Sequence, residues 1–85
     1  MKVVVVDDEP QIRRALRTTL EAHGYVVDTV GTGDEGVVAA AGQHPELILL
    51  DLGLPDMDGT EVIRRVRAFS EVPIIVLSVR ESQTD

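Results

Sequence analysis

The residues best suited to chemistry in this 85-residue chain each stand directly after a short apolar run. They are Asp7 and Asp8 after residues 3–6, Asp51 after residues 47–50, and Ser78 after residues 74–77. Carboxylates that crowd together raise one another's pKa, and a hard divalent cation with oxygen ligands removes that repulsion. Magnesium suits a site with few carboxylates, several waters and an incoming phosphate. The pattern therefore predicts a magnesium site, provided that the fold brings these residues together.

The apolar runs predict the strands that would position them. Continuous aliphatic runs at residues 3–6, 47–50 and 74–77 are typical of strands covered on both faces. The segment 25–30 alternates more weakly, so we expect it at a sheet edge. Because ligands of open parallel sheets bind beyond the carboxyl ends of the strands, the polar residues that follow these runs are expected at one edge.

Three segments between the strands have the spacing of amphipathic helices. The first helix is expected to begin at Pro10 and to end at Gly24. The second is expected at residues 33–42, after a Thr32–Glu35 capping pair. The third is expected to begin at an Asp58–Glu61 capping pair. Their expected apolar stripes are Ile12, Ala15, Leu16, Thr19 and Leu20, then Val37, Val38, Ala40 and Ala41, then Val62, Ile63, Val66 and Phe69. Strands alternating with helices predict an α/β fold, a parallel sheet with helices on both faces.

Composition excludes several classes of protein. The net charge of −7 disfavours direct binding to the phosphate backbone of nucleic acids. The chain has no cysteine, which rules out disulfides and thiolate chemistry. No apolar stretch approaches membrane-spanning length, and no secretory signal is visible at the start. A cytoplasmic protein is therefore expected.

Three segments resemble the signature segments of response-regulator receiver domains. They are Val-Val-Asp-Asp-Glu-Pro at 5–10, Leu-Leu-Asp-Leu-Gly-Leu-Pro-Asp-Met-Asp-Gly at 49–59, and Pro-Ile-Ile-Val-Leu-Ser at 73–78. The sequences of these segments are similar to those of the OmpR/PhoB class, and most of all to those of KdpE-type transcriptional regulators. The resemblance covers the whole chain and implies an incomplete CheY-like, doubly wound sheet with strand order 2-1-3-4.

The resemblance also implies a role for each site residue. Asp51 matches the phosphoacceptor, which takes a phosphoryl group from a phosphohistidine on a sensor kinase with the help of Mg²⁺. The metal ligands would be Asp8, Asp51 and the carbonyl of Gly53, with Asp7 acting mainly through water. Ser78 matches the hydroxyl that contacts the phosphoryl group. Such a domain is a signalling module rather than an enzyme, although it assists its own phosphorylation and dephosphorylation.

The chain departs from the family pattern after residue 77. Val79 stands where the family has a small residue, so it would narrow access to Asp51. The family's domain continues with a helix, a strand that carries a phosphoryl-binding lysine, and a helix, and this class adds a DNA-binding effector domain. Residues 1–85 match only the N-terminal portion, so we expect poor phosphoacceptance and no DNA binding by this chain alone. An exposed strand at 74–77 would favour dimers, segment exchange or aggregation.

The same residues allow other interpretations. Gly31-Thr32-Gly33-Asp34-Glu35-Gly36 is a literal dinucleotide-binding fingerprint, but its two acids would repel a pyrophosphate. An aspartyl phosphatase would need a second acid where Gly53 stands. Asp8 is also able to cap the first helix, with Gln11 as its partner. A receiver-like interaction module that is not phosphorylated remains an alternative.

Overall fold

The computed structural model describes residues 1–77, so the expectations for Ser78 and Val79 lie outside the described residues. Its elements are β1 (Lys2–Val6), α1 (Pro10–Ala22), β2 (Val26–Val30), α2 (Gly33–Gln43), β3 (Leu47–Leu50), α3 (Gly59–Arg67) and β4 (Ile74–Val76). The predicted alternation of strands and helices is confirmed. The predicted ends differ by one residue in places: β1 begins earlier, β2 begins later, α2 ends later and β4 ends earlier.

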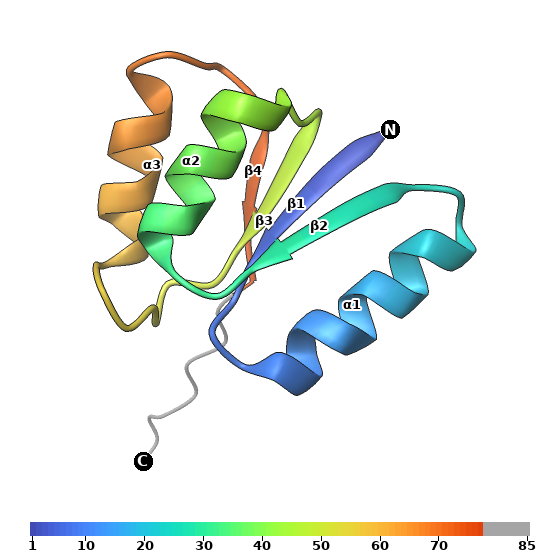
Figure 1. Ribbon diagram of the computed structural model, residues 1–85. Helices are drawn as coiled ribbons and strands as arrows, with labels where there is room; N and C mark the ends of the chain where they lie inside the picture. The colour runs from blue at the N-terminus through green and yellow to red at the C-terminus, as the bar shows by residue number, and fades with distance from the viewer. Residues whose placement is uncertain (78–85) are drawn as a thin grey trace.

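The four strands form one parallel sheet in the order β2-β1-β3-β4, as predicted. β2 lies at one edge, which confirms the interpretation of its weak alternation, and β4 lies at the other. In the register, Val6 lies opposite both Val30 and Leu50, and Leu50 lies opposite Val76. The carboxyl ends of all four strands therefore meet at one edge, in the lower part of Figure 1.

The two faces of the sheet are covered differently. α2 and α3 lie together on one face, and α1 lies alone on the other (Figure 1). The closed face, under α2 and α3, is formed by the buried residues Val4, Val6, Ala39, Ala40, Ile48, Leu50, Val62, Val66 and Val72. The open face, under α1, is formed by the buried residues Val3, Val5, Val27 and Leu49. Alternate residues of β1 and β3 thus enter different clusters, which explains why both strands are continuously apolar.

The predicted stripe of α2 is wrong at two positions. Val38 is 63% exposed and Ala41 is exposed, whereas the buried residues of the helix are Gly33, Gly36, Ala39 and Ala40. A Cβ at position 36 would lie only 2.9 Å from Cγ2 of Val6. The helix therefore turns its smallest residues toward the sheet and approaches β1 more closely than a valine stripe would allow.

The stripes of the other two helices are also less buried than predicted. Phe69 follows α3 and is 49% exposed, so its assignment to the buried stripe is wrong. In α1 no residue is buried, and Ile12 is 38% exposed. Leu16 and Leu20 nevertheless pack against the open face. A single helix covers part of that face but leaves its own flanks in solvent.

The helix caps are partly as predicted. Thr32 Oγ1 accepts a hydrogen bond from the Glu35 N–H (3.1 Å), but the Glu35 carboxylate accepts from the Gly31 N–H (3.1 Å) rather than from Thr32. Asp58 accepts from the Thr60 N–H (3.0 Å). Gly24 has φ +90°, in agreement with a left-handed residue after α1.

The expected reciprocal contact of Glu61 is wrong. Its carboxylate instead binds Arg64 (2.6 Å) and Arg65 (2.8 Å) on the exposed side of α3. These guanidinium groups lower the pKa of Glu61 to about 2. The two arginines thus lie on the outer surface of α3, where their guanidinium groups bind the Glu61 carboxylate.

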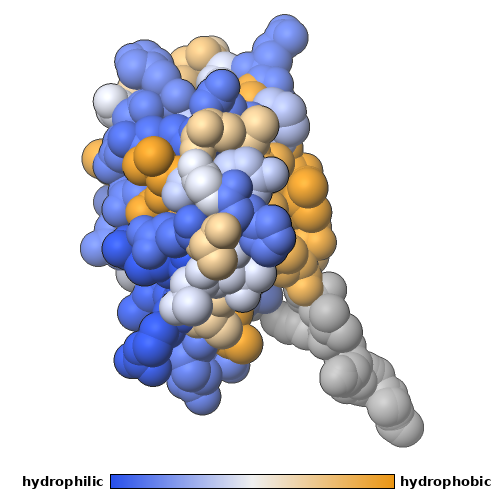
Figure 2. Space-filling model, turned by 90° about the vertical axis from the view of Figure 1, so that its right-hand side faces the viewer, coloured by the Kyte–Doolittle hydropathy of each residue, from blue (hydrophilic) through white to orange (hydrophobic). Residues whose placement is uncertain are grey.

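Apolar side chains reach the surface in a band along one side of the molecule (Figure 2). In the edge strand β4, Ile75 is 50% exposed and Val76 is 44% exposed. The predicted exposure of this edge is therefore present. Within residues 1–77, no helix is both long enough and apolar enough to cross a membrane.

Candidate metal centre

The three strand-end aspartates meet at the carboxyl edge of the sheet. One carboxylate oxygen from each of Asp7, Asp8 and Asp51 lies within 4.8 Å of the others. The Asp51 N–H donates to the Val6 carbonyl (2.9 Å), so the pairing of β3 with β1 continues up to Asp51. The parallel register thereby places the residue after β3 beside the residues after β1, which the sequence pattern required.

Asp7 is the buried member of the cluster, with 6% of its surface exposed. Burial raises its pKa above the usual range, and the nearby charges of Asp51 and Asp8 raise it further. A hydrogen bond from the Glu9 N–H to Oδ1 (2.9 Å) and the charge of Arg13 act in the opposite direction. The net result is a raised pKa, so ionisation of Asp7 costs more than ionisation of a solvent-exposed carboxylate.

Asp8 is exposed and Asp51 is half-buried. The N-cap of α1 is Glu9, whose side chain makes no capping bond, so the alternative that Asp8 caps this helix is wrong. Pro10 explains this: it occupies the first helical position, where its ring presets the backbone and no N–H needs an acceptor. Within residues 1–77 no hydrogen bond holds the Asp8 carboxylate, which leaves both oxygens able to bind a cation.

Arg13 is a neighbour of the cluster that sequence reasoning missed. Its Nη1 donates to the carbonyl oxygen of Asp7 (2.7 Å), and this contact ties α1 to the turn after β1. The spacing of Arg13 does not distinguish it from Arg14 or Arg17 in the same helix. The arginine that reaches the site depends on how α1 is oriented on the sheet, and the sequence does not specify that orientation.

The segment 52–58 connects Asp51 to α3 and contains Gly53 and Pro55. The Gly59 N–H donates to the Leu52 carbonyl (3.2 Å) and closes this loop at its base. Asp56, near its tip, accepts from the N–H groups of Gly33 (2.8 Å) and Asp34 (2.9 Å) at the start of α2. The sequence pattern gives no sign of this contact between the loop and the start of α2.

The chain returns to the same edge after β4. The Leu77 N–H donates to the Leu50 carbonyl (2.8 Å), which places Leu77 next to the end of β3. The expected position of Ser78, one residue further, lies outside the described residues.

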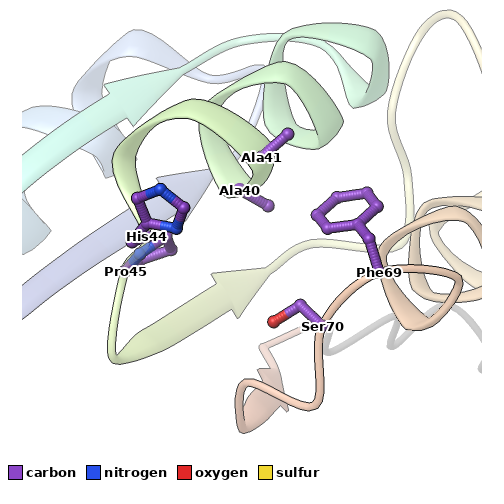
Figure 3. A pocket seen from close by; sticks show the side chains of 6 residues that line it. All are labelled: Ala40, Ala41, His44, Pro45, Phe69 and Ser70. Carbon is purple, nitrogen blue, oxygen red and sulfur yellow. The ribbon is translucent and has the colours of Figure 1, made fainter.

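A pocket of about 410 Å³ lies at the other end of the closed face, lined by Ala40, Ala41, His44, Pro45, Phe69 and Ser70. Figure 3 shows Phe69 across the opening from His44 and Pro45, which precede β3. Asp51 follows β3, so the pocket and the acidic cluster lie at opposite ends of that strand. The pocket therefore contributes no group to the candidate centre.

Curated relatives match nearly the whole chain. The transcriptional regulatory protein KdpE of Mycobacterium tuberculosis is 49% identical over 83 residues, and the KDP operon transcriptional regulatory protein KdpE of Escherichia coli is 52% identical over 83 residues. Each alignment covers 98% of this chain and 37% of the relative. The chain thus spans little more than a third of the length of these relatives.

Solved structures share the fold. The BeF₃-activated N-terminal receiver domain of Klebsiella pneumoniae RstA is 30% identical with a TM-score of 0.88, covering 100% of this chain and 71% of that one. The response regulator TrrA of Thermotoga maritima, in complex with Mg²⁺-BeF, is 34% identical with a TM-score of 0.86, covering 95% and 70%. The family model of the response regulator receiver domain matches residues 3–85. The chain therefore belongs to the response regulator receiver family of two-component signalling proteins.

Proposed function

We propose that Asp51 accepts a phosphoryl group from a phosphohistidine of a sensor kinase, with Mg²⁺ held by Asp8, Asp51 and the carbonyl of Gly53. Asp7 acts on the ion mainly through water. The observation that carries the proposal is the meeting of three carboxylate oxygens within 4.8 Å at the end of the sheet.

The donor set fits a hard divalent cation. Three carboxylates supply only oxygen ligands, and Asp8 is exposed, so bound waters have room on one side of the ion. Burial is the largest cause of the raised pKa of Asp7, and a divalent cation bound nearby would favour its ionised form. Mg²⁺ would neutralise the charge that develops on the phosphoryl oxygens during transfer.

Asp51 performs the covalent step. A carboxylate oxygen attacks phosphorus, the bond from phosphorus to the imidazole nitrogen of the donor breaks, and the electron pair of that bond returns to the imidazole. The product is an acyl phosphate on Asp51. Ser78 would contact the phosphoryl group. The chain's contribution is to position one acid, because transfers of this kind depend on alignment and electrostatics more than on covalent chemistry.

The partners follow from the same proposal. The kinase is the phosphoryl donor, and regulators such as KdpE that match this chain are transcriptional proteins. We infer that residues 1–85 are the N-terminal portion of a receiver domain in a cytoplasmic regulator. In that arrangement, contact with DNA belongs to parts of the whole protein outside this chain. Since a receiver-like module without phosphorylation would not need three converging acids, the acidic cluster favours the phosphoacceptor.

The dinucleotide alternative conflicts with the start of α2. A pyrophosphate would need the N–H groups of Gly33 and Asp34, and the Asp56 carboxylate already accepts both hydrogen bonds. The next N–H, of Glu35, donates to Thr32. The helix start is thus fully used by the chain's own oxygens.

The experiment is phosphorylation of the intact natural protein by its kinase or by a small acyl phosphate, followed by mass spectrometry. We expect one Mg²⁺-dependent phosphoryl group, lost in Asp51→Asn and strongly reduced in Asp8→Asn. Asp34→Asn removes an equal charge from an exposed position and serves as the matched control, with unchanged phosphorylation. Modification that persists at full level in Asp51→Asn contradicts the proposal.

A further inference from the structure

Asp56 is an acid that the proposed chemistry does not use, yet its carboxylate joins the loop after Asp51 to the start of α2 by two hydrogen bonds. Its Oδ1 accepts from the Gly33 N–H (2.8 Å) and its Oδ2 from the Asp34 N–H (2.9 Å). A carboxylate at a helix start satisfies N–H groups that have no partner within the helix, and it is favoured by the helix dipole. The two bonds use both oxygens, which fixes the orientation of the carboxylate as well as its place.

Apolar packing holds the same two segments together. A Cβ at position 33 would lie 2.6 Å from Cγ of Met57 and 2.9 Å from Cγ2 of Val62. The start of α2 therefore lies directly against the residue that follows Asp56 and against α3. The carboxylate contact and this close packing together hold the loop against the start of the helix.

The start of α2 is in turn fixed on β1. Gly36 lies against Val6, where an added Cβ would be 2.9 Å from Cγ2. Val6 is fully buried and immediately precedes Asp7 and Asp8. Contacts therefore connect the turn that carries Asp7 and Asp8 to α2, and α2 to Asp56. Gly53 lies three residues before Asp56 in the same loop.

We propose that Asp56 is a positioning residue, which holds the Gly53 carbonyl at the correct distance from Asp8 for both to bind one Mg²⁺. The inference rests on the proposed function, because it takes Gly53 and Asp8 as ligands of the same ion. The two ligands lie on separate turns, after β3 and β1, and Asp56 joins the turn after β3 to α2, which in turn packs on Val6 at the end of β1. Groups that orient metal ligands without touching the metal typically contribute about 10–100-fold to metal affinity.

The test is Mg²⁺ titration of the intact natural protein, followed by amide NMR, in wild type and in Asp56→Ala, Asp56→Asn and Asp34→Asn. Asp34→Asn is the matched control, because it removes one negative charge at the same helix start but leaves both hydrogen bonds of Asp56. We expect Asp56→Ala to weaken Mg²⁺ binding by about tenfold. Asp56→Asn keeps one acceptor oxygen, so its affinity should be intermediate, and Asp34→Asn should bind like wild type.

A second measurement separates positioning from a general loss of structure. At saturating Mg²⁺, we expect Asp56→Ala to be phosphorylated at nearly the wild-type rate, since the ion itself then holds the loop. A purely structural defect would lower the rate at every Mg²⁺ concentration, and that result overturns the proposal. Equal Mg²⁺ affinity in Asp56→Ala and wild type also overturns it. Unchanged affinity in Asp8→Asn would instead refute the proposed function.

Discussion

The two faces of the sheet differ in how completely they are sealed. On the closed face, two helices bury Val62, Val66 and the small residues of α2 against β1 and β3. On the open face, α1 buries none of its own residues, and the edge strand β4 leaves Ile75 half exposed.

This difference indicates where the site obtains its precision. The loop after Asp51 is fastened to α2 by Asp56 and by Met57, and α2 is fastened to Val6. On the open side, one arginine reaches the site, through the bond from Arg13 to the Asp7 carbonyl. We therefore infer that the closed face positions most of the site, and the first two predictions test this face directly.

The largest effect is expected from cavities made on each face. Leu50→Ala, at a fully buried position of the closed face, should lower the free energy of unfolding by about 3–5 kcal/mol. Leu20→Ala, at a half-buried position of α1, should cost only about 1 kcal/mol because solvent already reaches it. Urea denaturation of both variants measures the difference. Equal losses would show that the two faces are equally important to stability.

A smaller effect is expected from two glycines of α2. Gly36→Ala places a methyl group against the fully buried Val6, and such overpacking should destabilise the protein by about 1–3 kcal/mol. Gly42→Ala in the same helix meets no atom within 4 Å and should stabilise the protein by about 0.5–1 kcal/mol. Thermal unfolding gives both signs. A stabilising Gly36→Ala would mean that α2 does not lie tightly on β1.

The next prediction concerns Asp7, which lies at the carboxyl edge of the sheet, where the two faces meet. Its folded-state pKa is raised, so the ionised form carries a cost that is absent below pH 3.8 and develops as the pH rises through the folded-state pKa. Asp7→Asn should therefore raise the Tm of the metal-free protein at neutral pH, and the gain should vanish in acid. Unfolding followed from pH 3 to pH 7 without Mg²⁺ measures this dependence, and a gain that grows in acid would contradict the sign.

The smallest effect on stability, but a clear one on association, is expected at the open side. Ile75→Lys places a charge on the half-exposed edge strand, which should reduce self-association and change stability by less than about 0.5 kcal/mol. Val26→Lys is the control, since Val26 is 60% exposed on the opposite edge strand, next to α1. Light scattering over a range of concentrations compares them. A wild-type chain that stays monomeric at high concentration would contradict this expectation.

Much of this fold was predictable from the sequence because burial on both faces leaves a continuous apolar run. Residues 3–6 and 47–50 carry that pattern, and the aspartates that follow them are found at one edge. The rotation of α2 was not predictable by the same means. Hydrophobic periodicity predicts that Val38 is buried and gives no weight to Gly36. Close packing on Val6 instead favours glycine, which has no side chain.

The contacts of single polar side chains were also beyond the sequence pattern. Aspartate is an ordinary turn residue, and the partners of Asp56 at positions 33 and 34 lie at the start of a helix more than 20 residues away in the sequence. Glu61 matched a capping pair, yet two arginines one turn away bind it instead. The contact of Asp56 depends on the relative placement of two elements, whereas Arg64 and Arg65 lie three and four residues after Glu61 in the same helix, so that pairing is local.

The most direct test is the position of a divalent ion in crystals of the intact natural protein grown with Mn²⁺, which scatters anomalously and replaces Mg²⁺ at oxygen sites. We expect one ion bound by carboxylate oxygens of Asp8 and Asp51 and by the carbonyl of Gly53, with Asp7 reached through water. An ion bound elsewhere, or a carboxyl edge that binds no ion at saturating Mn²⁺, would contradict it.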